Sequence, residues 1–66
     1  MENIMQIEAD RLISGLILDP SGYDDWQTVK AVHPYVDAYG NVYDVEFYNG
    51  QRFKYRDGDE IYYRLA

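Results

Sequence analysis

The feature that most constrains the fold is a pair of alternating segments on either side of Asn49-Gly50. Residues 42–48 and 51–56 alternate apolar or aromatic side chains with charged or polar ones. Such alternation is typical of strands with one buried face, and an Asn-Gly pair between two such segments is a strong signal for a hairpin turn. The sequence therefore predicts an antiparallel β-hairpin over residues 42–56.

The length of the loop decides which side chains face each other across this hairpin. A two-residue turn would place acids beside aromatic rings. A three-residue loop over 48–50, with Gly50 left-handed, gives one apolar face and one face of opposite charges. We therefore predict the longer loop, with the pairs Val45–Phe53, Tyr43–Tyr55, Glu46–Arg52 and Asp44–Lys54. In this register Arg56 stands opposite Val42 and is left without a charged partner.

Shorter β-rich segments flank the hairpin. Residues 26–33 favour a strand, but Trp26, Val29 and Val32 cannot share one face unless a bulge or a bend intervenes. Pro34 cannot donate a ladder hydrogen bond and is expected at an edge or a strand end. Further strands are predicted over 16–18 and 61–65, and turns at 19–22, 37–41 and 57–60.

The first fourteen residues fit two patterns. Met5, Ala9, Leu12 and Ile13 match a helix stripe capped by Gly15, whereas residues 4–7 match the start of a strand, which we favour. Five short strands at this spacing are too few for a sandwich and indicate a small curled barrel. The fold class predicted is therefore all-β, one domain over residues 1–66, with the N-terminal segment as strand or helix.

The layout also resembles a known group of proteins. Its elements are single apolar residues and glycines: Ala9, Leu12 and Gly15 at equal spacing, then Ile17 or Leu18, Trp26-x-Thr28-Val29-x-x-Val32, Val45-x-Phe47-x-x-Gly50, and Tyr55 before a closing strand. This arrangement looks like the short SH3-like barrel proteins of bacteria and their phages. Leu16 departs from it, because an acidic residue often follows the glycine in those proteins. The resemblance implies a five-stranded SH3-like barrel and leaves the activity open.

The chain is short and has few ways to stabilise itself. A chain of 66 residues buries only roughly 60% of the surface that its unfolded form exposes. With no cysteine and one histidine, neither disulfides nor a structural metal is expected. Aromatic side chains must therefore supply much of the core, and we expect Tyr43, Tyr55 and Tyr63 inside.

The charge limits the classes of partner. Twelve acidic and six basic residues give a net charge of -6, which disfavours direct binding to nucleic acid or to an anionic membrane and favours a partner with a basic surface. Solubility is the simpler explanation of this charge. The N-terminus is not basic and no apolar run is long enough to span a membrane, so we expect a cytoplasmic protein.

No catalytic or metal-binding pattern is evident. His33 is the only imidazole, and nothing marks a nucleophile elbow near a serine or threonine. Asp24 and Asp25, like the acids of 57–60, do not match the spacing of a calcium loop, and they fit polar turns. The prediction is a protein that is not an enzyme and needs no cofactor.

The tyrosines suggest a binding surface. Five of the eight are left outside the predicted core, and exposed tyrosines are favoured at protein interfaces. The resemblance adds that aromatics of the early loops often line the groove of such barrels. The candidate partner-binding residues are Tyr23, Asp24, Asp25, Trp26, Tyr48 and Tyr62.

Two functions fit these observations. The first is a small interaction module or adaptor that binds a protein partner through exposed tyrosines, with self-association as a further option. The second is an acidic inhibitor of the phage type, which mimics nucleic acid and blocks a host defence or DNA-binding protein.

Overall fold

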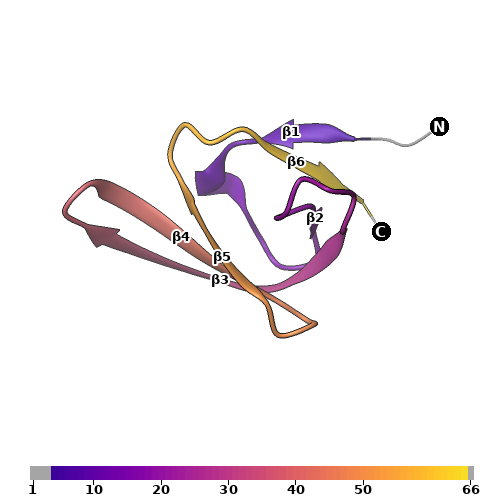
Figure 1. Ribbon diagram of the computed structural model, residues 1–66. Coiled ribbons are helices and arrows are strands. Elements are labelled where there is room, and N and C mark those ends of the chain that lie inside the picture. The colour runs from indigo at the N-terminus through magenta and orange to yellow at the C-terminus, as the bar shows by residue number, and fades with distance from the viewer. Residues whose placement is uncertain (1–3, 66) are drawn as a thin grey trace.

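The structure, a computed structural model, describes residues 4–65 and consists mainly of β-strands (Figure 1). All of these strands belong to one antiparallel sheet in the order β1-β6-β2-β3-β4-β5. The elements are β1 (Met5–Ile7), the 3₁₀ turn η1 (Ala9–Arg11), β2 (Ile17–Leu18), β3 (Gln27–Asp37), β4 (Gly40–Phe47), β5 (Arg52–Arg56) and β6 (Ile61–Arg64). The all-β prediction is confirmed.

The sheet differs from the predicted five-stranded barrel in strand number and in closure. It has six strands over the described residues and is open, with β1 and β5 as its edges. The additional strand is β1, which forms because residues 5–7 pair with residues 61–63 of β6. Extended structure is thus confirmed there, and the helical alternative is reduced to η1. The first residues fit a helix and a strand equally well by themselves, and pairing with the distant strand β6 makes them a strand.

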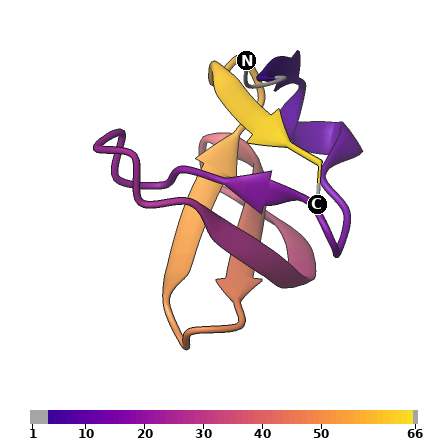
Figure 2. The same cartoon turned by 90° about the vertical axis from the view of Figure 1, so that its right-hand side faces the viewer.

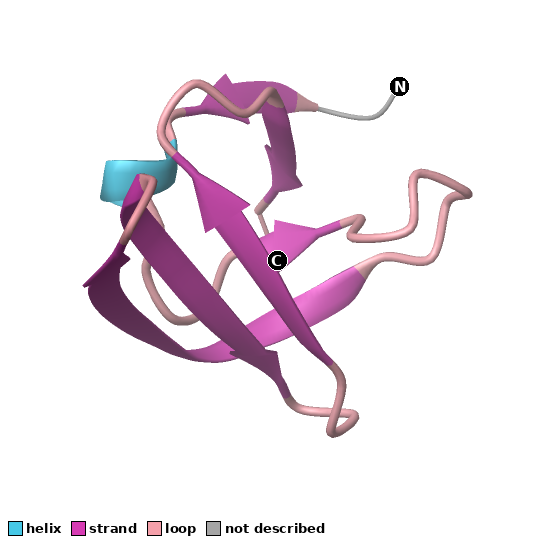
Figure 3. Cartoon of the chain, turned by 60° about the vertical axis from the view of Figure 1, so that its left-hand side comes forward, coloured by secondary structure: helices cyan, strands magenta, loops and turns pink. Residues whose placement is uncertain are grey.

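β3 connects the two halves of the sheet. Its first residues pair with β2 and the remainder with β4, so the sheet bends around the core along this strand (Figure 3). The register of β3 and β4 shifts between Val29 and Ala31, so of the two alternatives left open by the sequence, a bulge or a bend, a bulge is present. Pro34 lies inside β3, not at its end. It is tolerated there because β2 pairs only with residues 27 and 28, so this part of β3 has a free outer side.

The β4–β5 hairpin has the predicted register. Val45 stands opposite Phe53 and Tyr43 opposite Tyr55. Gly50 closes the three-residue loop with a φ of 91°, and its N–H donates to the carbonyl oxygen of Phe47 at 3.0 Å. The choice of the longer loop from the charge pattern is therefore confirmed.

The ion pairs across this hairpin are not the predicted ones. Arg52 pairs with Asp44 at 3.0 Å instead of Glu46, although Glu46 is directly opposite. Glu46 turns to the other side, where Lys30 Nζ lies 3.8 Å away and His33 Nε2 3.4 Å away. The alternation within the hairpin could not reveal these partners of Glu46, because they come from the neighbouring strand β3.

Arg56 also differs from the prediction, because it does have a charged partner. Its Nη1 donates to Asp37 Oδ1 at 3.1 Å, and its Nη2 donates to the second carboxylate oxygen. The guanidinium reaches across β4 to the end of β3, where Gly40, which stands opposite Asp37, has no side chain to block it. This bidentate pair joins β5 to the far end of the β3–β4 hairpin, which extends from the body in Figure 1.

The core lies between the two halves of the curled sheet. Tyr55 is buried, and Tyr43 and Tyr63 pack against the core with one side exposed, close to the prediction. Leu65, the last residue of the strand predicted over 61–65, is exposed, and β6 ends at Arg64. The buried side chains are Ala9, Leu12, Leu16, Leu18, Val29, Val42, Val45, Phe47, Tyr55 and Ile61.

Phe53 is the main departure from the predicted core. It lies on the inner face opposite Val45, yet 40% of its surface is exposed. Its ring packs against that of Tyr55 with centroids 4.6 Å apart. Because β5 is an edge strand, no further strand in the described part of the chain covers the other side of the ring.

The conformation of Gly50 gives a first prediction. Gly50→Ala should lower the free energy of unfolding by about 1 to 2 kcal/mol, because an L side chain is strained at positive φ. A Cβ there would have no atom within 4 Å, so the loss would come from the backbone alone. Urea denaturation measures it. Gly50→Asn is the matched control and should lose less, since asparagine tolerates this conformation; equal losses would contradict the explanation.

The Asp37–Arg56 pair predicts a dependence on acid. The guanidinium of Arg56, followed by the backbone N–H of Tyr39, lowers the pKa of Asp37 from 3.8 to about 2. A lowered folded-state pKa means that the stabilisation is complete above the ordinary pKa and disappears as the pH falls toward 2. Wild type should therefore be more stable than Asp37→Asn near neutral pH, and the difference should shrink below about pH 4. Urea titrations at a series of pH values test this, and a constant difference would contradict it.

Candidate partner-binding groove

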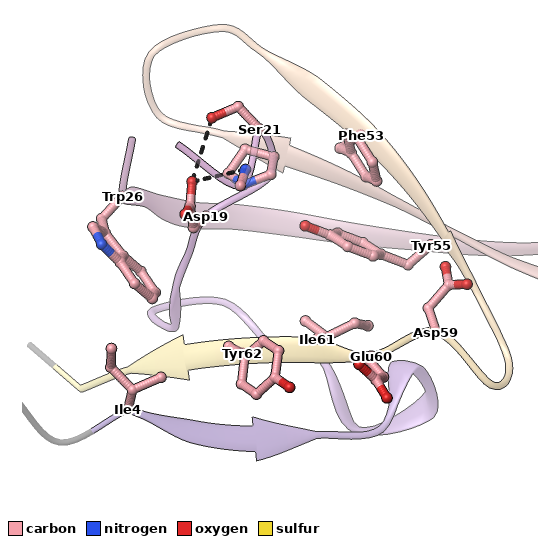
Figure 4. A pocket seen from close by; sticks show the side chains of 12 residues that line it. Ile4, Asp19, Ser21, Trp26, Phe53, Tyr55, Asp59, Glu60, Ile61 and Tyr62 are labelled. Carbon is pink, nitrogen blue, oxygen red and sulfur yellow. Dashed lines mark hydrogen bonds between the residues drawn. The ribbon is translucent and has the colours of Figure 1, made fainter. Parts of the chain in front are cut away.

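An open groove of about 690 Å³ lies between the loop after β2, β5 and the β1–β6 pair (Figure 4). Phe53 and Tyr55 of β5 line one side, and Trp26 at the end of the loop lies on the other. Ile4, Ile61 and Tyr62 form its floor. Its volume falls within the range of ligand sites, and most of the surface is aromatic or aliphatic.

A second cavity continues the groove toward the β4–β5 turn. It has a volume of about 350 Å³ and shares Pro20, Ser21 and Phe53 with the first. Gln51 and Arg52 line its far end. The two together form one cleft that follows β5, with the loop over residues 19–26 as the opposite wall.

The Asp19 carboxylate holds this loop in shape. Its Oδ1 accepts the N–H groups of Gly22 at 3.2 Å and Asp25 at 3.1 Å, and its Oδ2 accepts that of Asp24 at 3.0 Å. The Ser21 hydroxyl donates to the same carboxylate at 3.4 Å. One side chain therefore binds three backbone donors of the turn, and the loop projects from the body in Figure 2.

The loop in turn positions Trp26. Asp24 adopts a left-handed φ of 61°, and its Oδ1 accepts the indole Nε1–H at 3.2 Å. The guanidinium of Arg64 lies over the ring, 5.2 Å from its centroid. The indole is thereby fixed by a hydrogen bond and a cation–π contact, with one side open to the groove.

Carboxylates stand at one end of the groove. Asp59 and Glu60 belong to the turn before β6 and are exposed. Asp59 is anchored, because its Oδ2 accepts the N–H of Arg56 at 2.8 Å. Burial, followed by the charges of Asp19 and Asp59, raises the pKa of Tyr55 to about 12, so its hydroxyl stays protonated at neutral pH. An apolar groove ending in negative charge can accept an apolar side chain beside a cationic one.

The structure brings together some of the predicted site residues. Trp26 and Tyr62 both line the groove, and Asp25 lines its continuation. Tyr23 and Asp24 lie on the same loop, with Tyr23 89% exposed. Tyr48 is exposed at the β4–β5 turn and does not line the groove. All five tyrosines predicted to be outside the core are exposed: Tyr23, Tyr35, Tyr39, Tyr48 and Tyr62.

Several lining residues were not predicted. Phe53 and Tyr55 were assigned to the core, Ile4 to the start of a strand and Glu60 to a polar turn. The signal for Phe53 was available in principle, because an aromatic residue on an edge strand has a side without a neighbouring strand. That β5 is an edge follows from the strand order, which alternation along the chain does not reveal.

A separate cleft of about 740 Å³ lies between β1, η1 and the turn before β6. Its lining includes the carboxylates of Glu8, Asp10, Asp57, Asp59 and Glu60. The Asp57 carboxylate already accepts two hydrogen bonds within the chain, from Asn41 Nδ2 at 2.9 Å and from the Tyr43 hydroxyl at 3.0 Å. Over residues 4–65, no group of three or more histidines, cysteines and acids has the arrangement of a metal site.

Comparisons with known proteins give no relative. The chain matches no protein-family model, no curated protein and no solved structure. None of the helical structure in the described residues is long and apolar enough to cross a membrane.

The role of Asp19 can be tested in isolation. In Asp19→Asn one carboxylate oxygen becomes an NH2 group, which cannot accept a hydrogen bond. If it replaces Oδ2, the bond from the Asp24 N–H is lost. If it replaces Oδ1, the bonds from Gly22 and Asp25 are lost. We expect the amides of the loop to exchange with solvent at least about tenfold faster, with a loss of global stability of about 1 kcal/mol. Asp25→Asn is the control, since within the described residues the Asp25 carboxylate accepts the side-chain amide of Gln27 and no backbone N–H of the loop. Equal exchange in both variants would contradict the role given to Asp19.

Proposed function

We propose that this protein is a non-enzymatic interaction module whose groove binds an extended segment of a partner protein. The observation that supports it most is the combination in one groove of the open faces of Trp26, Phe53 and Tyr62 with the carboxylates of Asp59 and Glu60. Rigid aromatic side chains around a depression are typical of the residues that dominate binding energy at interfaces. The SH3-like resemblance belongs to this proposal, as a relationship of fold only.

The proposed partner segment carries an apolar side chain and, two residues away on the same side of the extended chain, a lysine or arginine. The apolar group would cover the exposed rings, which otherwise remain in contact with water. The cation would meet Glu60 and Asp59 at the end of the groove, and the net charge of -6 would favour its approach. A buried pair with Asp19 is not part of this proposal, because that carboxylate is used within the loop.

Short random peptides selected by display against the protein test this function. The selected sequences should be rich in apolar residues with a Lys or Arg two residues away, and binding should shift the fluorescence of Trp26, the only tryptophan. Trp26→Ala or Tyr62→Ala should weaken the selected peptides by about 2 kcal/mol, roughly 30-fold in Kd, while the melting temperature changes little. Tyr48→Ala is the matched control, an exposed tyrosine outside the groove, and should bind normally.

Two results would contradict the proposal. One is the absence of any selected peptide whose binding depends on Trp26 or Tyr62. The other is a set of tyrosine variants whose only effect is a lower melting temperature. A concentration-dependent dimer in which the groove is covered would show that a second copy of this chain is the occupant instead.

A second candidate function is inhibition of a DNA-binding or defence protein by mimicry of nucleic acid. The acid-lined cleft beside η1 favours it, because its carboxylates lie close together on one surface. Against it, the carboxylates of Asp37, Asp44 and Glu46 already form ion pairs with lysine or arginine side chains of the same chain. Mimicry requires binding that falls steeply between about 50 and 500 mM salt and slower association for the double variant Glu8→Gln, Asp10→Asn, whose carboxylates line this cleft. Salt-insensitive binding through the groove would reject it.

A further inference from the structure

The free edge of β5 forms one wall of the cleft. Among the described residues only β4 pairs with β5, so the other side of this strand has no neighbour in the sheet. The loop over 19–26 faces β5 across the cleft and does not form a strand with it. An edge strand with a cleft beside it is the geometry that a peptide needs in order to add to a sheet.

The hairpin register shows which backbone groups point into this cleft. Opposed residues in an antiparallel pair alternate between those that exchange hydrogen bonds and those that do not. Phe47 N–H donates to the carbonyl oxygen of Gln51 at 2.9 Å, so Phe53 and Tyr55 also turn their backbone groups toward β4. The backbone groups of Arg52, Lys54 and Arg56 therefore point away from β4.

Asp59 confirms this direction at Arg56. Its carboxylate accepts the Arg56 N–H at 2.8 Å, and its own N–H donates to the Arg56 carbonyl oxygen at 3.1 Å. Asp59 thus occupies the edge at this residue in the way that a neighbouring strand would. At Arg52 and Lys54 no hydrogen bond within the described part of the chain uses the outward backbone groups. The edge is closed at one end and open along the cleft.

The side chains of β5 indicate what the added strand must carry. Phe53 and Tyr55 face the groove, so strand residues on that face would meet apolar surface. Lys54 is on the other face, where it forms no ion pair among the described residues and lies over the ring of Tyr35, 5.9 Å from its centroid. Asp44, directly opposite Lys54, holds Arg52 instead. A carboxylate from an added strand would supply the missing partner of Lys54.

We propose that the partner segment binds as an extra β-strand along β5, with apolar residues in the groove and an Asp or Glu beside Lys54. This rests on the proposed function and adds the mode of binding to it. A second copy of β5 is a poor occupant, because antiparallel self-pairing would bring the row of Arg52, Lys54 and Arg56 against an identical row.

The test is a comparison of Lys54→Pro with Lys54→Gln, using a peptide selected by display as the probe. Both variants remove the charge, but only proline removes the outward N–H, and it removes no hydrogen bond to β4. Lys54→Pro should bind at least about tenfold more weakly than Lys54→Gln, while Lys54→Gln should mainly affect peptides with an acid at the matching position. Equal binding by the two variants would overturn strand addition.

A second measurement leaves the protein unchanged and is independent of the folding of Lys54→Pro. Methylation of the peptide's backbone nitrogens, one at a time, should weaken binding at alternate residues, since only every second N–H of an added strand faces β5. A profile without alternation would overturn the inference. Should the same peptide still lose affinity with Trp26→Ala, the groove function stands and only the strand mode fails. No selected peptide at all would contradict the groove function itself.

Discussion

The register of the β4–β5 hairpin is the constraint on which the rest of the structure depends. It places Val45 and Tyr55 on the inner face of the sheet, where they complete the core with Phe47 of the same hairpin. It also directs the backbone groups of Arg52 and Lys54 outward, along the cleft. A shift by one residue would turn the charged face inward and the aromatic face to solvent, so core and groove would be lost together.

A chain without disulfides keeps its long loop ordered by local polar contacts. The carboxylate of Asp19 satisfies three backbone donors of residues 22–25, and Asp24 then holds the indole of Trp26. At the other end of the molecule, Asp37 and Arg56 connect the tip of the β3–β4 hairpin to β5. In the sequence these acids appear only as solubilising charge or as residues of polar turns. Part of the negative charge is therefore structural.

Much of the hairpin could be predicted from the sequence, whereas the site could be predicted only in part. Trp26 and Tyr62 were selected because aromatic residues outside a small core favour interfaces, and both line the groove. Phe53 was missed because its alternation marks it as inward-facing, and alternation does not reveal whether a neighbouring strand covers it. The partners of Glu46 were missed for a related reason, since Lys30 and His33 come from another strand.

The sequence by itself determined the features that depend on near neighbours: the all-β class, the hairpin loop with left-handed Gly50, the need for a bulge or bend in β3 and the exposure of five tyrosines. These follow from side-chain alternation and turn chemistry, which act over a few residues. Only the tertiary structure decided that the sheet is open, that β1 pairs with β6 and that β5 is an edge beside the loop of Asp19. Strand order results from contacts between distant segments, and the alternation within one strand is the same whichever neighbour it finds.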